Sequence, residues 1–462
     1  MRRIVSVLVL AAMALGGSTP WAGESEATAR ILGAALAGEG AYRTLAYLTD
    51  RIGPRLSGSE GLEKAVRWTA EELRRAGLDP VRTERVMVPH WVRGTESSRI
   101  VAPVEHEMAT TALGGSDPTP EGGVTAEVVE VANLGALRAL GAEKVRGKIV
   151  LFNKKMRRNG GETDGYGAAV PARGSGASEA AKLGAVATLL RSLGTAAYRL
   201  PHTGAMNYED GVPRIPAAAI AEEDADLIHR LLSAGDTVRV HLELGCKTLP
   251  DAESANVVAD LRGRERPDEI VLIGGHLDSW DLGAGAIDDG AGIAIVMETV
   301  RLLKALDLRP RRTIRVVLFT NEENGLRGGK AYAADHEKEL AKHVVAIESD
   351  GGGGRPKGFG VSGGPGAVDV VKSIASPLRA IGADDVADGG GGADISPTRN
   401  AGVPQMGLRQ DGTYYFDYHH TAADTLDKVD PGELAMNVAA MAVMAYSLAE
   451  RDHPLPRIPP KK

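Results

Sequence analysis

Residues 270–349 alternate short apolar runs, typical of buried strands, with longer runs typical of helices. The expected order is strand 270–274, helix 292–306, strand 313–320, helix 326–335 and strand 344–349. Successive strands can lie parallel only when a crossover segment, usually a helix, returns the chain to the same end of the sheet. The pattern therefore predicts an α/β fold with a mixed, mostly parallel sheet flanked by helices.

Side chains that bind metal ions follow these strands. His276 comes after the first strand, Glu323 after the second and Asp350 after the third. Ligands of open α/β sheets bind at the carboxyl ends of the strands, so we expect these three residues in one crevice. Asp288 in Ile-Asp-Asp-Gly and His420 in His-His-Thr-Ala-Ala-Asp complete a set of five metal-type ligands.

The composition of this set indicates zinc and hydrolysis. Imidazole and carboxylate are zinc ligands, and a catalytic site keeps one position open for water. Five ligands are too many for one such ion but suit two, if one carboxylate bridges them. Two ions about 3.5–4 Å apart can act together on a water and a substrate carbonyl. Glu322, beside Glu323, then supplies a spare carboxylate to move a proton.

Two other acidic residues lie beside these ligands. Asp278 follows His276 by two positions and, on an extended strand end, can accept the other ring N–H of that histidine. A solvated surface carboxylate is the alternative for Asp278. Asp288 and Asp289 place two anions side by side, which is favourable next to divalent cations. The alternative for either aspartate is a negative charge at a helix N-terminus.

Glu322 and Glu323 are adjacent, so they point to opposite sides if the chain is still extended there. One of the two could then bind metal while the other faces a substrate. An exposed acidic turn is the alternative interpretation.

The chain is too long, at 462 residues, for one typical core, so we expect two domains. From residue 96 to about residue 254 the sequence changes to Gly/Pro-rich turns and short strands, and it holds none of the five ligands. We predict a signal segment at 1–22, an N-terminal part of the catalytic domain at 23–98, an inserted domain at 99–252 and the catalytic core at 253–462.

The N-terminus has the features of a secretion signal. Arg2 and Arg3 precede an apolar run over residues 4–15, which Gly, Ser and Pro separate from Ala22. Such a run is shorter than the roughly 20 residues that span a bilayer, but it suits a signal peptide. We expect cleavage near Ala22 and a secreted or periplasmic protein without a membrane anchor. An uncut N-terminal anchor is the alternative.

The net charge and the cysteine content argue against a nucleic-acid-binding, membrane-binding or disulfide-stabilised protein. The net charge of −7 argues against nucleic acid or an anionic membrane surface as the main partner. Cys246 is the only cysteine, so the chain has no intrachain disulfide. We expect Cys246 to be a buried structural thiol and stability to come from packing and bound metal.

Longer motifs resemble the two-zinc exopeptidases, a family that includes bacterial leucine aminopeptidases. They are residues 48–58 (LTDRIGPRLSG), 88–91 (VPHW), 275–281 (GHLDSWD), 201–204 (PHTG) and 210–213 (DGVP). The predicted insert resembles a protease-associated domain, of which residues 147–150 (GKIV) are a typical piece.

The resemblance implies a role for each ligand. His276 and Asp350 would hold one zinc ion, Glu323 and His420 a second, and Asp288 would bridge the two.

The resemblance also implies roles beyond the metal ligands. Glu322 would be the general base. Some relatives carry a tyrosine before the last ligand, where it can stabilise the oxyanion; His419 stands there in this chain and would donate a hydrogen bond, or be merely structural. Asp394 stands where several relatives have an Asp-His pair, but Ile395 replaces that histidine, which leaves Asp394 a supporting role. Weaker candidates for contact with a substrate terminus are Arg399, Arg409 and Tyr415.

The implied activity is hydrolysis of short unblocked peptides or dipeptides, of carboxypeptidase or dipeptidase type, by a homodimer. An aminopeptidase of the same family is the first alternative. A receptor-like relative without activity and a one-metal glutaminyl cyclase are further alternatives, and the presence of all five ligands counts against the receptor.

Overall fold

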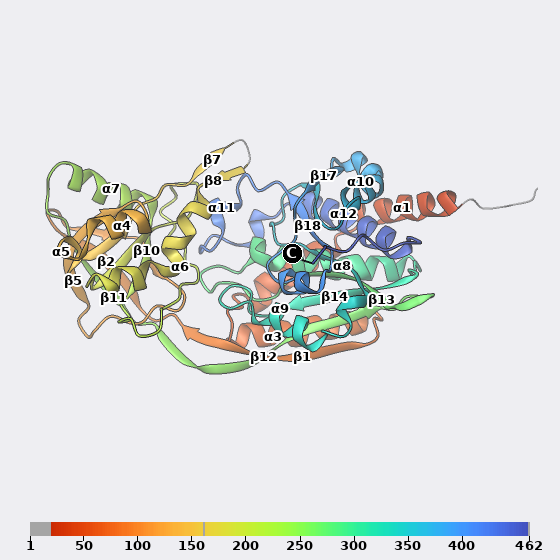
Figure 1. Ribbon diagram of the computed structural model, residues 1–462, viewed down its shortest axis with the longest axis horizontal. Helices are drawn as coiled ribbons and strands as arrows, with labels where there is room; N and C mark the ends of the chain where they lie inside the picture. Colours follow the sequence, from red (N-terminus) through yellow and green to blue (C-terminus); the bar gives the residue numbers. More distant parts are fainter. Residues whose placement is uncertain (1–19, 160–161, 461–462) are drawn as a thin grey trace, which may run out of the picture.

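The computed structural model describes residues 20–159 and 162–460 and shows two lobes, each built on an eight-stranded sheet (Figure 1). We call residues 20–92 and 247–460 the core lobe and residues 96–244 the insert lobe. Most of the predicted signal segment, residues 1–19, lies outside the described residues.

The sheet of the core lobe has the order β1-β12-β14-β13-β15-β18-β16-β17. Its strands are β1 Val81–Val92, β12 Lys247–Leu261, β13 Arg266–His276, β14 Arg312–Phe319, β15 His343–Glu348, β16 Pro356–Ser362, β17 Asp385–Asp388 and β18 Gln405–Gln410. The four central strands β14, β13, β15 and β18 are parallel. Strand β12 pairs antiparallel with β1 and β14, and β16 pairs antiparallel with β18 but parallel with β17. The sheet is therefore mixed with a parallel centre, as the sequence predicts.

Both faces of this sheet are covered. Alternate residues of β13 pack into different clusters: Val271 and Ile273 on one face, Ile270 and Leu272 on the other. Because side chains of a strand alternate between faces, strands buried on both sides consist of continuous apolar runs. The helices on the first face are α1 Pro20–Leu36, α2 Gly40–Tyr47, α3 Glu60–Arg75, α8 Ala291–Ala305, α10 Ala367–Ala375 and α12 Pro431–Glu450. Helix α9 (Arg327–Asp335) covers the other face through Tyr332.

Helix α12 is long and apolar enough to cross a membrane by length and composition, but 83% of its apolar window is buried. It packs against α1 and α8, so it is a central core helix.

The sheet of the insert lobe has the order β3-β2-β11-β5-β6-β9-β10-β4. Its strands are β2 Glu96–Ala102, β3 His106–Met108, β4 Thr110–Ala112, β5 Val124–Val131, β6 Ile149–Phe152, β9 Ala187–Arg191, β10 Ala217–Ile220 and β11 Arg239–Leu244. Its helices are α4 Leu134–Leu140, α5 Ala142–Val145, α6 Tyr166–Lys182 and α7 Glu222–Ser233. A separate hairpin joins β7 Arg157–Asn159 to β8 Glu162–Asp164.

Strands β1 and β12 connect the two lobes. They pair antiparallel over residues 81–92 and 247–259 and run side by side from the core sheet toward the insert lobe (Figure 1). The insert lobe is thus held on a two-stranded stem. The division of the chain at residues 99 and 252 stays a prediction, and so does the identity of the insert as a protease-associated domain.

One predicted element differs in length. The sequence predicts a short helix over residues 178–183, whereas α6 extends over Tyr166–Lys182 and includes Pro171. Alanine, glycine and serine dominate this helix, so it carries little apolar periodicity to read. Its small residues, Ala177 and Ala180 among them, pack closely against the sheet of the insert lobe.

Cys246 is buried, as predicted, and its thiol donates to the carbonyl of Ser116 at 3.1 Å. Burial raises the pKa of this thiol to about 11, so it is protonated and unreactive at neutral pH.

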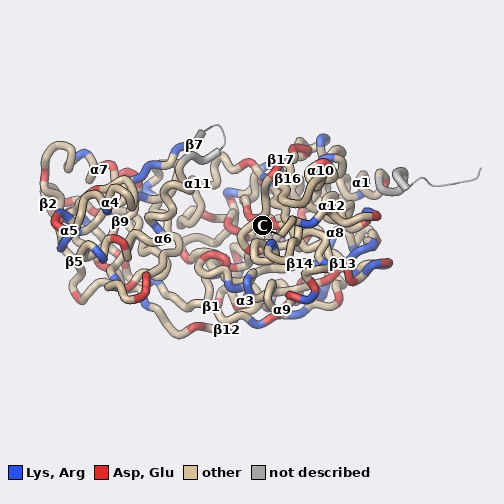
Figure 2. The backbone as a smooth tube through the Cα atoms, viewed as in Figure 1, with Lys and Arg blue, Asp and Glu red and all other residues tan. Residues whose placement is uncertain are grey.

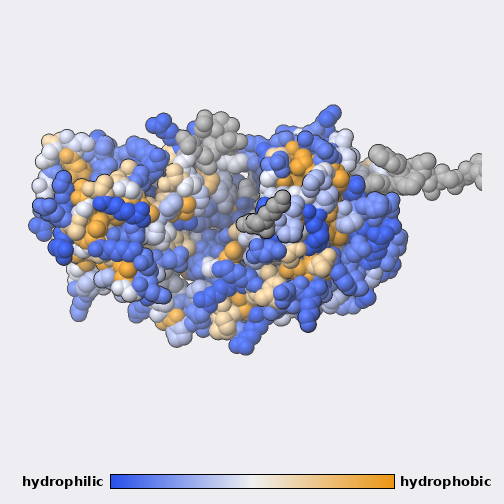
Figure 3. All heavy atoms as spheres, in the orientation of Figure 1, coloured by the Kyte–Doolittle hydropathy of each residue, from blue (hydrophilic) through white to orange (hydrophobic). Residues whose placement is uncertain are grey.

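The surface carries charges of both signs, interspersed over the two lobes (Figure 2). The face drawn in Figure 3 is mostly hydrophilic and is hollowed between the lobes. The candidate metal centre belongs to the core lobe and contacts the insert lobe, as the distances below show.

Candidate metal centre

The five predicted ligands come from five separate segments of the core lobe. His276 is the last residue of β13, while Glu323 and Asp350 follow β14 and β15. Because β14, β13 and β15 are neighbouring parallel strands, their carboxyl ends meet at one edge. Asp288 lies in the short helix η2 (Ala286–Gly290) that leads into α8, and His420 follows α11 (Tyr415–Tyr418).

The structure brings these five side chains together around Asp288. His276 Nε2 is 3.1 Å from Asp288 Oδ1 and 3.4 Å from Asp350 Oδ1. His420 Nε2 is 3.2 Å from Asp288 Oδ2 and 3.0 Å from Glu323 Oε2. Asp288 Oδ1 therefore faces His276, which also faces Asp350, and Asp288 Oδ2 faces His420, which also faces Glu323. This is the arrangement expected of a carboxylate that bridges two metal positions.

The donor set fits divalent cations. Tetrahedral zinc with bonds of about 2.0–2.1 Å holds its nitrogen and oxygen ligands roughly 3.3 Å apart. The observed separations, 3.0–3.4 Å, agree with that value. Asp288 Oδ2 and Glu323 Oε1 are also buried without a hydrogen bond, although buried carboxylate oxygens are normally satisfied. His276, Asp288 and Asp350 form one group that could hold a metal ion.

The charges of the site also favour bound divalent cations. Burial opposes protonation of His420, but Glu323 and Asp288 outweigh it and raise its pKa to about 10. Burial likewise opposes protonation of His276, yet Asp288 and Asp350 raise its pKa well above the usual value. The protein alone would therefore hold protons on both rings. Bound cations would displace these protons, because only the neutral ring can be a ligand.

Both ligand histidines are oriented through the second ring nitrogen by a backbone carbonyl. His276 Nδ1 is 3.0 Å from the carbonyl oxygen of Asp278, whereas the Asp278 carboxylate is 3.9 Å away. The orienting contact predicted for this carboxylate is thus made by the carbonyl of the same residue. His420 Nδ1 is 3.2 Å from the carbonyl oxygen of Thr203, which belongs to the insert lobe. Thr203 lies in the PHTG motif, but nothing in the sequence analysis predicted its contact with His420.

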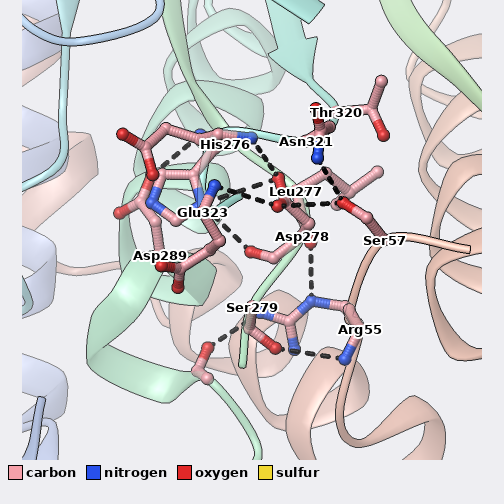
Figure 4. A network of polar contacts seen from close by, with 12 residues as sticks. Arg55, Ser57, His276, Leu277, Asp278, Ser279, Asp289, Thr320, Asn321 and Glu323 are labelled. Atoms are coloured by element: carbon pink, nitrogen blue, oxygen red, sulfur yellow. Dashed lines mark hydrogen bonds and ion pairs between the residues drawn. The ribbon is translucent and has the colours of Figure 1, made fainter. Parts of the chain in front are cut away.

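The carboxylate of Asp278 holds the turn that carries the two glutamates. It accepts a hydrogen bond from the backbone N–H of Glu323 at 3.2 Å (Figure 4) and another from that of Glu322 at 3.0 Å. Asp278 is fully buried, so it is not the solvated surface carboxylate of the alternative interpretation.

One expectation from the sequence assumed an extended chain at the two glutamates. The structure shows that the chain is not extended there. Strand β14 ends at Phe319, Asn321 has a left-handed backbone with φ of 60°, and residues 322–325 form a turn. Glu323 points to His420 within this turn. Burial and the neighbouring acidic groups raise the pKa of Glu322 well above its usual value. Glu322 is therefore near enough to the acidic ligands to feel their charge, but it does not form a close contact with the ligand histidines.

Asp289 has a structural role. Its Oδ2 accepts from the backbone N–H of His276 at 3.1 Å, and its Oδ1 accepts from that of Gly292 at 3.1 Å. Gly292 lies in the first turn of α8, so the alternative of a negative charge at a helix N-terminus describes Asp289. The side chain of Asp288 instead faces the ligands.

Two residues that the sequence analysis left without a role fix the loop before Asp288. Arg55 is fully buried and donates to the carbonyl of Leu277 at 2.8 Å (Figure 4). It also donates to the carbonyls of Ala284 at 2.7 Å and Gly285 at 2.9 Å. Asp424 accepts from the backbone N–H groups of residues 286 and 287, both at 2.7 Å. Both residues lie in motifs noted in the sequence, but their targets are backbone groups, which side-chain patterns do not reveal.

His419 lies against the cluster. Its Nε2 is 3.4 Å from Asp288 Oδ2, and its ring stacks on that of His420 with centroids 3.5 Å apart. Burial and the charge of His420 lower the pKa of His419 well below its usual value, so the ring is neutral. Asp288, His419 and His420 form a second group that could hold a metal ion. Metal binding is therefore a further possible role for His419, beside the roles expected from the sequence.

The remaining candidates divide between the site and the surface. Asp394 is buried with neither carboxylate oxygen bonded, and burial together with Glu348 raises its pKa well above the usual value. The ring of Tyr415 lies 5.0 Å from that of His419. Arg409 forms a surface ion pair with Asp385 and Arg399 is exposed.

Imidazole and carboxylate groups gathered around one shared carboxylate, at the end of a parallel sheet, define a metallohydrolase. Residues 256–445 match Peptidase family M28. The chain is also 43% identical to carboxypeptidase Q of Mus musculus over 416 residues, which cover 90% of this chain and 87% of that protein. The protein belongs to peptidase family M28 and is a metallopeptidase.

Solved structures agree with this assignment. The Peptidase M28 precursor from Shewanella amazonensis is similar with a TM-score of 0.91 and 42% identity, covering 95% of this chain and 100% of that chain. BSAP, a zinc aminopeptidase from Bacillus subtilis, is similar with a TM-score of 0.64 and 25% identity, covering 90% of this chain and 96% of that chain.

Proposed function

We propose that this metallopeptidase is a two-zinc exopeptidase that hydrolyses short peptides or dipeptides, of carboxypeptidase or dipeptidase type. The observation that carries the proposal is the pair of ligand groups that share Asp288, one with His276 and Asp350, the other with Glu323 and His420. The similarity to carboxypeptidase Q supports the carboxypeptidase type.

The chain's own residues account for the remaining requirements of hydrolysis. Zinc ions, when bound at the two groups, supply Lewis-acid polarisation of the scissile carbonyl and a lower pKa for the attacking water. The Glu322 carboxylate takes the proton of that water and passes it to the leaving amine. Its raised pKa suits a group that must hold a proton between two transfers. Asp278 keeps Glu322 in place through the backbone of the turn.

His419 is the proposed hydrogen-bond donor to the oxyanion. The ring is neutral and buried beside Asp288, so one N–H can be aimed at a substrate oxygen without adding a charge. Space for a substrate side chain lies nearby: a cavity of about 180 Å³ is lined by residues 351–354, which follow Asp350, and by Ile287, Tyr414, Tyr415 and Tyr418, among others.

An aminopeptidase is the second candidate, because the similar enzyme BSAP is a zinc aminopeptidase. One dipeptide, blocked first at its amino end and then at its carboxyl end, separates the two functions. We expect release of the free amino acid from the amino-blocked peptide if the enzyme is a carboxypeptidase, from neither blocked peptide if it is a dipeptidase, and in both cases no hydrolysis of the carboxyl-blocked peptide. The opposite result would make the enzyme an aminopeptidase.

We also propose secretion or periplasmic export and a homodimer. Residues 1–22 support export through their basic start and short apolar run. Sequencing the N-terminus of mature protein from the medium or periplasm tests the cleavage near Ala22. Light scattering of the purified protein tests the dimer.

A further inference from the structure

Arg93 lies in the connection between the two lobes. It directly follows β1, in residues 93–95, which lead from the core lobe into β2 of the insert lobe. Its side chain is only 13% exposed, and the guanidinium carbon lies 5.0 Å from the centre of the Trp91 ring. Each nitrogen of this guanidinium has a hydrogen-bond partner, so its position is closely defined.

The guanidinium joins the core lobe to the insert lobe. On the core side, Nε is 2.9 Å from Asp281 Oδ2 and Nη2 is 2.6 Å from Asp281 Oδ1, the paired geometry in which arginine binds a carboxylate most strongly. On the insert side, Nη1 donates to the hydroxyl of Thr111 at 2.6 Å and to the carbonyl of Ala112 at 2.8 Å. Nη2 also donates to the hydroxyl of Thr203 at 3.3 Å. Arg93 therefore connects the GHLDSWD motif of the core lobe with the PHTG motif of the insert lobe.

Thr203 connects Arg93 to the metal centre. It is 1% exposed, and its hydroxyl donates to the carbonyl of Ala112 at 2.9 Å. Its backbone contacts His420 twice. The N–H of Thr203 donates to the carbonyl of His420 at 3.0 Å, and the carbonyl of Thr203 is 3.2 Å from Nδ1 of the His420 ring. The contacts thus run without a break from Asp281 through Arg93 and Thr203 to a predicted metal ligand.

The backbone of His420 needs support from its surroundings. Its φ is 62°, in the left-handed region that residues other than glycine rarely occupy. Such a conformation persists only where neighbouring groups fix it, and Thr203 supplies two of the bonds that do so. His276, in contrast, ends a strand of the core lobe and is oriented by the carbonyl of Asp278 in the same lobe. The two predicted metal positions therefore differ in how far they depend on the insert lobe.

We propose that Arg93 is a positioning residue that fixes Thr203, and through it His420, when the insert lobe is docked on the core lobe. The metal position of Glu323 and His420 then depends on the contact between the lobes, whereas the position of His276 and Asp350 does not. This inference rests on the proposed two-zinc function and adds the residue through which the insert lobe completes one of the two positions.

The test measures zinc binding to the metal-free, full-length protein by competition with a chelator. It compares Arg93→Met with the control Arg312→Met. Arg312 is also buried, paired with a carboxylate and bonded to backbone carbonyls, but it lies at the amino end of β14, opposite the end that carries the ligands. Asp350→Asn and Glu323→Gln, which each weaken one metal position, assign the two binding steps.

We expect Arg93→Met to lower the zinc affinity of the position of Glu323 and His420 about 10- to 100-fold, as loss of a group that orients a ligand does. The affinity of the position of His276 and Asp350 should match wild type. Arg312→Met should leave both affinities unchanged while lowering the free energy of unfolding, measured with urea.

A second variant tests the route through Thr203. Thr203→Val removes the hydroxyl that accepts from Arg93 but keeps the shape of the side chain and the carbonyl that faces His420. Because the two side chains share one contact, the double variant should lose less zinc affinity than the product of the two single fold-changes. A loss equal to that product would mean that Arg93 does not act through Thr203 and would overturn the proposal.

The zinc titration separates this inference from the function on which it rests. If the wild-type protein binds only one zinc ion per chain, the two-zinc function itself is wrong. If the wild type binds two ions and Arg93→Met keeps both affinities or loses both equally, the assignment of Arg93 is wrong and the function stands. Should Arg93→Met fail to fold, Arg93→Lys carries the same comparison, because an ammonium beside Asp281 lacks the fork that also reaches Thr203.

Discussion

The two lobes contribute to the site in different ways. The core lobe supplies all five ligand side chains from segments that end at one edge of its sheet. The insert lobe supplies none of these, yet it orients His420 through the carbonyl of Thr203 and places the ring of Tyr166 edge-on to that of His419 at 5.9 Å. The side chains that could bind metal are thus concentrated in one lobe, while the other lobe helps to position them.

The largest loss should come from a change in the core lobe. Glu322→Gln removes the proton acceptor but keeps the size of the side chain, so we expect kcat to fall about 10²–10⁴-fold with unchanged zinc content. Steady-state kinetics and atomic absorption measure the two quantities. Retained turnover would remove Glu322 from the role of base and leave the core lobe without an identified one.

The next largest effect should come from His419, which lies between the lobes. His419→Ala should lower kcat about 10²-fold, as loss of one oxyanion donor does, while both metal positions stay filled. His229→Ala, an exposed histidine of the insert lobe, is the control. Loss of one zinc ion in His419→Ala would show instead that His419 is a ligand, and unchanged turnover would make it structural.

A smaller effect, on zinc affinity, should show that the insert lobe helps to orient His420. Gly204→Ala drives a Cβ into Arg173 and should shift the adjacent carbonyl of Thr203, so zinc affinity should fall about tenfold. Gly211→Ala is the control, because Gly211 also has a positive φ but no atom within 4 Å of its Cβ position. Competition with a chelator measures affinity. Equal affinities would mean that the core lobe orients His420 unaided.

The smallest effect concerns stability of the core lobe away from the site. Glu84 and Glu339 flank His336 at 3.0 Å and 2.8 Å and, against the effect of burial, raise its pKa. A raised folded pKa means that the protonated ring stabilises the fold below the unfolded pKa and that this contribution is lost as pH rises through the folded pKa. His336→Gln should therefore cost at most about 1 kcal/mol near pH 6 and less at higher pH.

Urea unfolding at the two pH values measures this difference, and kcat at neutral pH should match wild type. A stability difference that grows with pH would contradict the sign of the effect.

The sequence predicted the core lobe better than the insert lobe, for physical reasons. Strands β13, β14 and β15 are buried on both faces, so they appear as continuous apolar runs that a reader can locate. Helix α6 consists mainly of small residues and shows no such contrast, so most of it was missed. The missed part carries Tyr166, whose ring contacts that of His419.

The side chains that could bind metal were predicted from the sequence, but the backbone contacts that orient them were not. His276, Glu323 and Asp350 were proposed from residue type and their place after strands, and Asp288 and His420 from residue type and local motif; the structure brings all five together. Thr203 was not, because any residue offers the same carbonyl, and its contact with His420 joins segments 217 residues apart. The extended chain assumed at Glu322 was wrong because Asn321 begins a turn, which local composition did not indicate.

The central claim is that two zinc ions share Asp288. Diffraction data collected on crystals of the purified enzyme at the zinc absorption edge test it most directly. We predict two anomalous peaks, one against His276 and Asp350 and the other against Glu323 and His420, both in contact with the Asp288 carboxylate. A single peak, or peaks that do not touch Asp288, would contradict the account.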